Sequence, residues 1–245
     1  MFKAKSISII FPAYNEQDNI LESVRNAEKF AVKKKLDYEI IIVNDGSKDQ
    51  TKQLVLALCK QNKRVKLINH AKNQGYGSTV FDGLKSAKKD LIFFTDSDLQ
   101  FKIDELDRFF LQINEFDVVI GYRSPRSDPF MRILNAWAWK QLIRVVFGIK
   151  IKDVDCAFKL FRRDSISDLY VRSRGAMFSA EMIIKLLSQK KKIKQLPVSH
   201  YRRMAGSPTG AKPSVIAKAF RELSSVRKEL KRDLSQIDGC ERIIF

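Results

Sequence analysis

Residues 6–11, SISIIF, and residues 38–43, YEIIIV, are the two stretches that decide the fold. Each is a short run rich in apolar and β-branched residues that ends in polar loop residues, a pattern that predicts a buried β-strand. Between them, residues 19–35 carry apolar side chains at the spacing of an amphipathic helix. A strand, a helix and a strand in this order form the repeating unit of a parallel sheet.

The same alternation continues along the chain. The expected elements are helices at residues 49–61 and 103–114, a helix that ends at residue 88 after a glycine-rich turn, and strands at residues 65–69, 91–95 and 117–121. We therefore expect an α/β fold, a mostly parallel sheet flanked by helices, in which the polar residues after each strand meet at one edge.

The regular alternation stops after residue 121. Residues 129–147 predict a long apolar and aromatic helix, and residues 198–210 form a polar loop rich in Arg, Gly and Pro. Residues 214–234 predict a basic amphipathic helix, since an apolar stripe runs through a segment otherwise rich in Lys and Arg. We expect one catalytic domain over residues 1–210 and a basic tail over residues 211–245.

The composition limits the class of protein. The 245 residues carry a formal charge of +18, more than solubility requires, which indicates contact with phosphates, nucleic acid or an anionic lipid surface. The three cysteines lie far apart and predict neither a disulfide framework nor a zinc site. No signal peptide or membrane-spanning run is expected, so we predict a cytoplasmic protein with at most peripheral membrane contact.

The strongest chemical signal is the sequence TDSDLQ at residues 95–100, directly after a predicted buried strand. The carboxylates of Asp96 and Asp98, with the neutral oxygen of Gln100, can face a single hard cation. Mg²⁺ typically takes one or two carboxylates and completes its shell with phosphate oxygens and water. A loop that caps the next helix is the alternative interpretation of the same residues.

Two further polar segments follow predicted strands. The sequence FPAYNE occupies residues 11–16, and VNDGS occupies residues 43–47. Taken singly, Asp-Gly-Ser is most often a turn. Because the carboxyl ends of parallel strands share one edge, the three segments together predict one ligand crevice.

In order and spacing, PAYNE, VNDGS and DSDLQ resemble the nucleotide-sugar half of GT-A fold, family 2 glycosyltransferases. The branch that fits contains dolichyl-phosphate mannose and glucose synthases. The sequences DCAFKLF at residues 155–161 and HYRR at residues 200–203 resemble segments of its polyprenyl-phosphate glucosyltransferase members. The resemblance implies a GT-A, Rossmann-like fold with a nucleotide-sugar half over residues 1–123 and an acceptor half over residues 124–210.

The resemblance also implies roles for individual residues. The residues implied for the nucleotide sugar are Pro12, Tyr14, Glu16, Val43, Asp45, Asp96, Ser97 and Arg203. Those implied for Mg²⁺ or Mn²⁺ are Asp96, Asp98 and Gln100, and those implied for the acceptor phosphate are Arg132 and Asn135. Arg123 is expected near the transferred group, and Asp155 is expected in the site, either as a base or as a residue that orients Lys159 or an arginine.

We therefore predict an inverting hexosyltransferase that uses UDP-glucose or GDP-mannose and a polyprenyl or dolichyl phosphate acceptor, at the cytosolic face of a membrane. Transfer to a hydroxyl of a soluble glycan or protein is the alternative. A nucleic-acid binder does not explain the acidic pair, which would repel a polyanion. A nucleotidyltransferase does not explain the aromatic segment around Trp137.

Two segments leave alternatives open. Trp137 and Trp139 suit either a lipid headgroup boundary or the core. The tail helix suits an anionic membrane surface, the catalytic domain, a second copy of the chain or a small membrane-anchoring partner.

Overall fold

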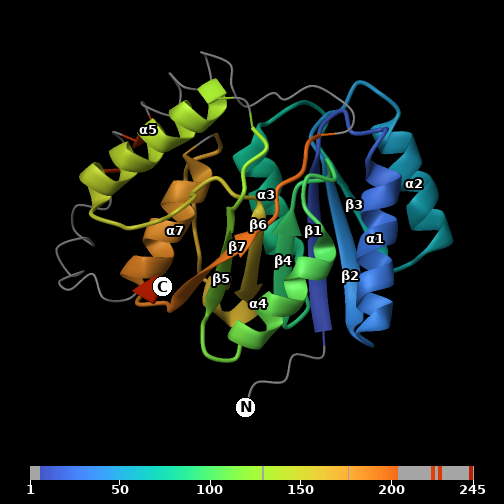
Figure 1. The fold of residues 1–245 in the computed structure, drawn as a ribbon. Helices are drawn as coiled ribbons and strands as arrows, with labels where there is room; N and C mark the ends of the chain where they lie inside the picture. The colour runs from blue at the N-terminus through green and yellow to red at the C-terminus, as the bar shows by residue number, and fades with distance from the viewer. Residues whose placement is uncertain are drawn as a thin grey trace.

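The computed structural model describes residues 6–128, 130–175, 177–203, 222–223, 226–227 and 243–244, with the backbone alone at residues 132, 243 and 244. The described chain folds around one sheet with strand order β3-β2-β1-β4-β6-β5-β7-β8. Helices cover both faces of this sheet (Figure 1). The predicted α/β class with a mostly parallel sheet is confirmed.

The first half of the sheet follows the predicted alternation closely. Its elements are β1 (Ser6–Ala13), α1 (Ile20–Lys33), β2 (Asp37–Asn44), α2 (Thr51–Gln61), β3 (Val65–Asn69), α3 (Tyr76–Ser86) and β4 (Leu91–Thr95). All pairings among these four strands are parallel. The strands are buried because helices cover both faces, which explains their continuous apolar runs.

Strand β1 runs two residues further than its sequence predicts, through Pro12 to Ala13. Its pairing with β4 ends at Ile10, while its pairing with β2 continues to Ala13. Proline lacks a backbone N–H group, so it interrupts a ladder only where that group is needed. One side of β1 has no strand partner beyond Ile10 among the described residues, and Pro12 is tolerated there.

The second half of the fold departs from the simple alternation. Its elements are η1 (Ile103–Glu105), α4 (Leu106–Gln112), β5 (Val118–Arg123), α5 (Phe130–Phe147), β6 (Phe158–Arg162), α6 (Arg163–Ile166), α7 (Phe178–Ser188), β7 (Ile193–Val198) and β8 (Ile243–Ile244). Strand β6 enters the sheet antiparallel between β4 and β5. The sequence did not predict β6, α7 or β7, in part because β6 carries charged residues at Lys159 and Arg162.

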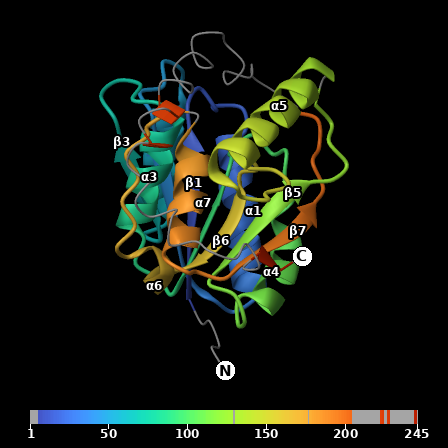
Figure 2. The same cartoon turned by 90° about the vertical axis from the view of Figure 1, so that its left-hand side faces the viewer.

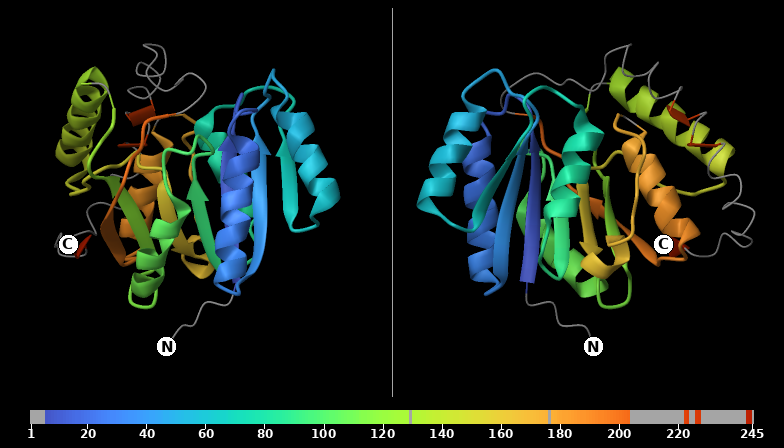
Figure 3. Two further views of the ribbon diagram at one scale, coloured as in Figure 1. Left: turned by 45° about the vertical axis from the view of Figure 1, so that its right-hand side comes forward. Right: turned by 180° about the vertical axis from the view of Figure 1, so that it is seen from behind.

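Two apolar clusters lie on the two faces of the sheet. One gathers side chains from α1, α2 and α4, and the other gathers side chains from α3, α5 and α7. Figure 2 shows α5 and α7 on one face of the sheet. In Figure 3, the left view has α1 in front of the sheet, and the right view shows the opposite face. Alternate residues of β1, such as Ile9 and Ile10, enter different clusters, as expected of a strand buried on both sides.

Most of the predicted tail helix lies outside the described residues. At residues 222–223 and 226–227 the chain is helical, and Leu223 and Val226 are buried within the cluster formed with α3, α5 and α7. These two residues belong to the apolar stripe predicted for the tail, so this part of the stripe packs on the catalytic domain.

Candidate nucleotide-sugar and metal site

The loops after β1 and β2 are joined by hydrogen bonds at the carboxyl edge of the sheet. The backbone N–H of Asn15 donates to Ser47 Oγ at 2.9 Å, and Asn15 Oδ1 accepts from the backbone N–H of Lys48 at 2.8 Å. Asn15 has a φ of 56°, a left-handed conformation that asparagine tolerates better than most residues. The two predicted polar segments therefore form one connected rim.

The third segment is joined to the same rim through Ser97. Its hydroxyl donates to the Pro12 carbonyl at 3.0 Å, and its own carbonyl accepts from Ser23 Oγ at 2.8 Å. The side chain of Ser97 is buried. Ser97 thus ties the loop after β4 to β1 and α1, and its hydroxyl faces protein instead of the crevice.

Asp45 anchors a neighbouring turn. Its carboxylate accepts from the backbone N–H groups of Gln74 at 2.8 Å and Gly75 at 2.9 Å, and one of its oxygens lies 2.8 Å from His70 Nδ1. His70 Nε2 lies 3.0 Å from Asp82. The sequence assigned no role to His70, and a single histidine after a strand gave no signal for this bridge.

The turn that follows β2 requires glycine at position 46. Its φ is 67°, and a Cβ at this position would lie 2.6 Å from the backbone carbon of Lys72. Only glycine fits so close an approach in a left-handed conformation. The turn that follows β2 is therefore set by backbone contacts before any ligand binds.

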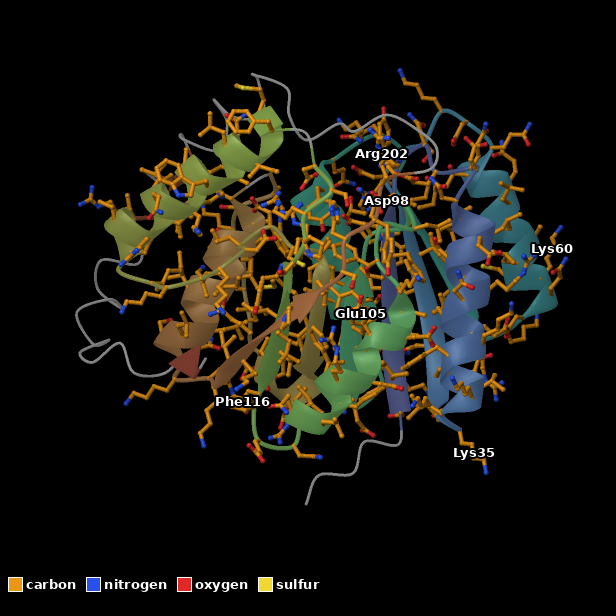
Figure 4. All side chains as sticks on the ribbon, in the orientation of Figure 1. Lys35, Lys60, Asp98, Glu105, Phe116 and Arg202 are labelled. Carbon is orange, nitrogen blue, oxygen red and sulfur yellow. The ribbon has the colours of Figure 1, made fainter. Side chains whose placement is uncertain are left out.

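Two acidic residues at the edge, Glu16 and Asp98, pair with Arg203, which lies far along the chain. Arg203 Nη1 lies 3.3 Å from Asp98 Oδ2, and Arg203 Nη2 pairs with Glu16 Oε1. The other oxygen of Glu16 accepts from Asn19 Nδ2 at 2.7 Å. Figure 4 shows Asp98 at the upper edge of the sheet with Arg202, the neighbour of Arg203, while Lys35 and Phe116 mark the opposite edge. Three residues implied by the resemblance are thereby brought together.

Asp96 lies beside this group and is half-buried. The hydroxyl of Tyr76 donates to Asp96 Oδ1 at 3.1 Å. Burial among protein atoms raises the pKa of Asp96 to about 7, and the negative charge of Asp98 adds to the increase. Two carboxylates that disfavour each other's ionisation are stabilised together by a cation.

The donor set fits a hard divalent cation. Asp96 and Asp98 supply two carboxylates, which is what Mg²⁺ usually takes from protein when substrate phosphates complete its shell. The amide of Gln100 is fixed by donating from Nε2 to the Tyr201 carbonyl at 2.9 Å. In the described part of the chain, no group of three or more His, Cys, Asp or Glu residues could hold a metal unaided. Phosphate oxygens and water can complete such a shell.

The remaining residues implied for the nucleotide differ in exposure. Tyr14 is half-buried at the rim, whereas Pro12 is buried and its carbonyl accepts from Ser97. The side chain of Val43 is fully buried in the core, where it lies over Gly83 of α3. Only the backbone of Val43 could reach a nucleoside.

Arg123 lies in a buried ion pair. Its Nε and Nη2 donate to the two oxygens of Asp153 at 2.7 and 2.8 Å, and Nη1 lies 3.6 Å from Asp128. Burial alone would lower the pKa of Arg123, but Asp153 and Asp128 outweigh it and raise the pKa. The sequence implied Arg123 and missed Asp153, which carries no motif of its own.

Asp155 faces a pocket between α5 and the turn that precedes β6. The pocket has a volume of about 170 Å³ and combines cationic, apolar and acidic side chains. Its lining residues are Arg126, Ile133, Ala136, Trp137, Trp139, Lys140, Lys152, Asp153, Val154 and Asp155. The surrounding protein raises the pKa of Asp155 to about 6, and the charge of Asp153 contributes to the increase.

Helix α5 places its two tryptophans differently. Trp137 is 54% exposed at the mouth of the pocket, whereas Trp139 packs against the core. Asn135 is exposed on the same helix, and the side chain of Arg132 lies outside the described residues. Both predicted acceptor residues thus sit on α5, and Asn135 is not among the described residues that line the pocket.

The sequence is similar to known proteins of one family. The sequence model for glycosyl transferase family 2 matches residues 8–170. The dolichyl-phosphate beta-glucosyltransferase of Saccharomyces cerevisiae is 28% identical over 221 residues, which cover 79% of this chain and 66% of that protein. The undecaprenyl-phosphate 4-deoxy-4-formamido-L-arabinose transferase of Pseudomonas fluorescens is 28% identical over 203 residues, with coverages of 82% and 58%. The chain thus spans less than two thirds of the length of either relative.

Solved structures share the fold. Glucosyl-3-phosphoglycerate synthase from Mycobacterium tuberculosis, solved with UDP, has a TM-score of 0.68 at 19% identity, covering 91% of this chain and 80% of that one. Mannosyl-3-phosphoglycerate synthase from Rubrobacter xylanophilus has a TM-score of 0.66 at 13% identity, with coverages of 96% and 76%. The predicted GT-A fold is confirmed by this likeness.

Proposed function

Since the chain belongs to glycosyl transferase family 2, we propose that it moves a hexose from a nucleotide diphosphate sugar to a polyprenyl or dolichyl phosphate, with inversion at the sugar carbon. The observation that carries the proposal is the meeting of Asp98, Glu16 and Arg203 beside Asp96 at the carboxyl edge of the sheet. Acidic residues for a cation and an arginine for a diphosphate are what departure of a nucleoside diphosphate requires.

On the donor side, Asp96 and Asp98 would hold Mg²⁺ or Mn²⁺, with Gln100 next to them. A bound divalent cation supplies charge stabilisation for the leaving diphosphate. Arg203 lies between Asp98 and Glu16, where it would also be close to the charge of the leaving diphosphate. A guanidinium can bind phosphate oxygens in a bidentate fashion. Tyr14, and the backbone near Val43, would border the nucleoside.

On the acceptor side, the pocket beside α5 suits a phosphate attached to an apolar chain. Arg126, Lys140 and Lys152 contribute positive charge, while Ile133 and Trp137 contribute an apolar wall. We place the acceptor phosphate here, with Arg132 and Asn135 along its approach. A phosphate oxygen would form the bond to the sugar carbon as the bond from that carbon to the diphosphate breaks, its electron pair leaving with the nucleoside diphosphate.

Asp155 suits this reaction as an ionised carboxylate. A phosphate monoester has a second pKa near 6 and arrives largely as a dianion at neutral pH, so it needs no base. With a pKa of about 6, Asp155 is mostly ionised at pH 7. It would then stabilise positive charge that develops on the sugar ring as the leaving group departs.

The outer face of α5 supports a peripheral position on the cytosolic face of a membrane. Its exposed side chains include Phe130 at 75%, Met131 at 61%, Leu134 at 42%, Trp137 at 54% and Val145 at 81%. Exposed apolar residues that gather in this way mark an interaction site. Among the described residues, no helix has the length and apolar character needed to cross a membrane.

Transfer to a soluble hydroxyl acceptor is the second candidate. It is favoured by one observation: Asp155 is exposed at the pocket and makes no hydrogen bond to a described residue, as a base awaiting a hydroxyl would. In that reaction Asp155 would take the proton of the hydroxyl.

An extraction assay separates the two acceptors. The protein is incubated with radiolabelled UDP-glucose or GDP-mannose, Mg²⁺ and vesicles that contain a polyprenyl phosphate, and the products are partitioned between organic solvent and water. The proposal expects label in the organic phase with one of the two donors. Label that enters only water-soluble products would reject the polyprenyl phosphate acceptor.

A further inference from the structure

Lys159 is a charged side chain that the mechanism above does not use. It lies in β6, paired with Phe94 of β4 and Ile120 of β5, and none of its side chain is exposed. Removing an ammonium group from water destabilises the fold unless protein groups replace its hydration. Burial accordingly lowers the pKa of Lys159. Its position therefore calls for strong local partners.

Those partners are backbone carbonyls. Lys159 Nζ donates to the Val154 carbonyl at 3.2 Å and to the Cys156 carbonyl, and it lies 5.3 Å from the centre of the Phe94 ring. An ammonium has three N–H donors, so it can hold two carbonyls and still face a ring. The two carbonyls belong to the residues on either side of Asp155.

The same turn is held at its other end. Asp153 accepts three hydrogen bonds from Arg123, two from the guanidinium and one from the backbone N–H. A Cβ at Gly121 would lie 3.1 Å from Cys156 Sγ, so β5 packs closely against the turn. Asp153, Val154 and Cys156 are buried, and Asp155 is the exposed residue among these four. The turn therefore presents one carboxylate to the pocket and fixes the backbone around it.

Lys159 also adds charge beneath the pocket. The protein around the pocket and the charge of Asp153 raise the pKa of Asp155, whereas the charges of Lys159, Arg123 and Arg126 lower it. Besides Asp155, the ionisable groups whose charges act on Lys159 are Cys156, Asp153 and Asp96. The positive charge of Lys159 therefore favours the ionised form of Asp155.

We propose that Lys159 is a positioning residue of the acceptor side: its ammonium holds the backbone on both sides of Asp155 and so fixes that carboxylate at the pocket. The inference rests on the proposed function, in which an ionised Asp155 acts during sugar transfer. Lys159 touches neither substrate in this account and acts through Asp155.

Three variants test this role. Lys159→Met removes both the donors and the charge, Lys159→Gln removes the charge but keeps an N–H donor, and Leu160→Met is the control, a buried residue next along the same strand whose substitution conserves volume. Each variant is compared with the wild type in thermal unfolding, in kcat and donor KM, and in the pH dependence of kcat. The Asp155 carboxylate is also titrated by ¹³C NMR and assigned with Asp155→Asn.

We expect kcat to fall about 10-fold to 100-fold in Lys159→Met, and less in Lys159→Gln, with the donor KM changed less than about threefold. The acidic limb of kcat and the Asp155 titration should both move to higher pH in both variants, because a positive charge is lost. Leu160→Met should match the wild type in both pH measurements. If Lys159→Met does not fold, Lys159→Gln carries the same test.

A folded Lys159→Met or Lys159→Gln protein whose Asp155 titrates as in the wild type, with kcat within about twofold, would overturn the inference. A wild type that transfers no sugar to a polyprenyl phosphate would instead refute the proposed function. The NMR titration does not depend on turnover, so the effect of the Lys159 charge on the pKa of Asp155 is measured in either case. An Asp155 pKa that is unchanged in the variants contradicts the role proposed for Lys159.

Discussion

The donor side and the acceptor side of this chain are built in different ways. On the donor side, short polar loops after β1, β2 and β4 are joined by hydrogen bonds from Asn15 to Ser47 and from Ser97 to Pro12. On the acceptor side, α5 exposes large apolar side chains above a pocket with cationic walls. The difference matches what the proposed function requires, namely a polar site for a soluble nucleotide and an amphiphilic surface for a lipid phosphate.

The largest effect is expected on the rate of transfer, from a change on the donor side. Replacing Asp98 by Asn should lower transfer at least about 100-fold, because the leaving diphosphate loses its cation. Turnover is measured with saturating Mg²⁺, and excess chelator should have the same effect on the wild type. Asp104→Asn, on an exposed residue of η1, is the matched control. Full turnover of the wild type in chelator would rule out the metal.

The next largest effect is expected on stability, from a change on the acceptor side. Asp153→Asn removes the nearer of two charged partners of the buried Arg123 and leaves Asp128 at 3.6 Å, so the free energy of unfolding should fall by about 3 kcal/mol. Urea denaturation measures this, with the exposed Asp168→Asn as the control. Equal unfolding midpoints for Asp153→Asn and the wild type would show that the ion pair does not support this half.

A smaller effect would sharpen the contrast between the two surfaces. Leu134 on α5 and Leu111 on α4 are both exposed, at 42% and 72%. Leu134→Ser should weaken binding to anionic vesicles about threefold to tenfold, since one apolar contact is lost, whereas Leu111→Ser should not. Sedimentation with vesicles gives the bound fraction. A larger loss for Leu111→Ser would place the lipid surface on the other face of the sheet.

The smallest effect concerns a buried carboxylate beneath the donor side. Burial raises the pKa of Glu39, but hydrogen bonds from Lys66, Ser8 and the backbone of Lys88 outweigh it, so the pKa lies below 4.5. A lowered folded pKa stabilises the protein above pH 4.5, and this contribution is lost as the pH falls through the folded value.

Glu39→Gln should therefore cost about 1 kcal/mol at pH 7. It should also lose less stability than the wild type between pH 6 and pH 3. Urea unfolding at the two pH values measures the difference, and Glu22→Gln, on a residue of α1 whose side chain is 43% exposed, is the control. A steeper loss in Glu39→Gln would contradict the lowered pKa.

The sequence predicted the donor side well and the acceptor side poorly, for physical reasons. The buried strand at residues 91–95 was predicted with the bounds that β4 has, because a parallel strand covered on both faces is a continuous apolar run. Strand β6 was missed because it carries a buried lysine, whose carbonyl partners come from a turn that no local pattern specifies.

The candidate site shows the same division. Glu16, Asp98 and Arg203 could be named from motifs and do meet in space, although Glu16 and Arg203 lie 187 positions apart. Asp153, His70 and Tyr76 could not be named, because each is defined by a partner from another element. Val43 and Ser97 were placed at the site by their motifs, yet their side chains pack within protein.

The central claim is that Asp96 and Asp98 hold the cation that stabilises the leaving diphosphate. Electron paramagnetic resonance of Mn²⁺ in the presence of UDP or GDP tests it most directly, with the wild type, Asp98→Asn and Asp104→Asn compared at equal concentration. We predict that the wild type and Asp104→Asn remove Mn²⁺ from solution only when the nucleotide is present, and that Asp98→Asn does not. Binding of Mn²⁺ by Asp98→Asn as tight as that of the wild type would contradict the account.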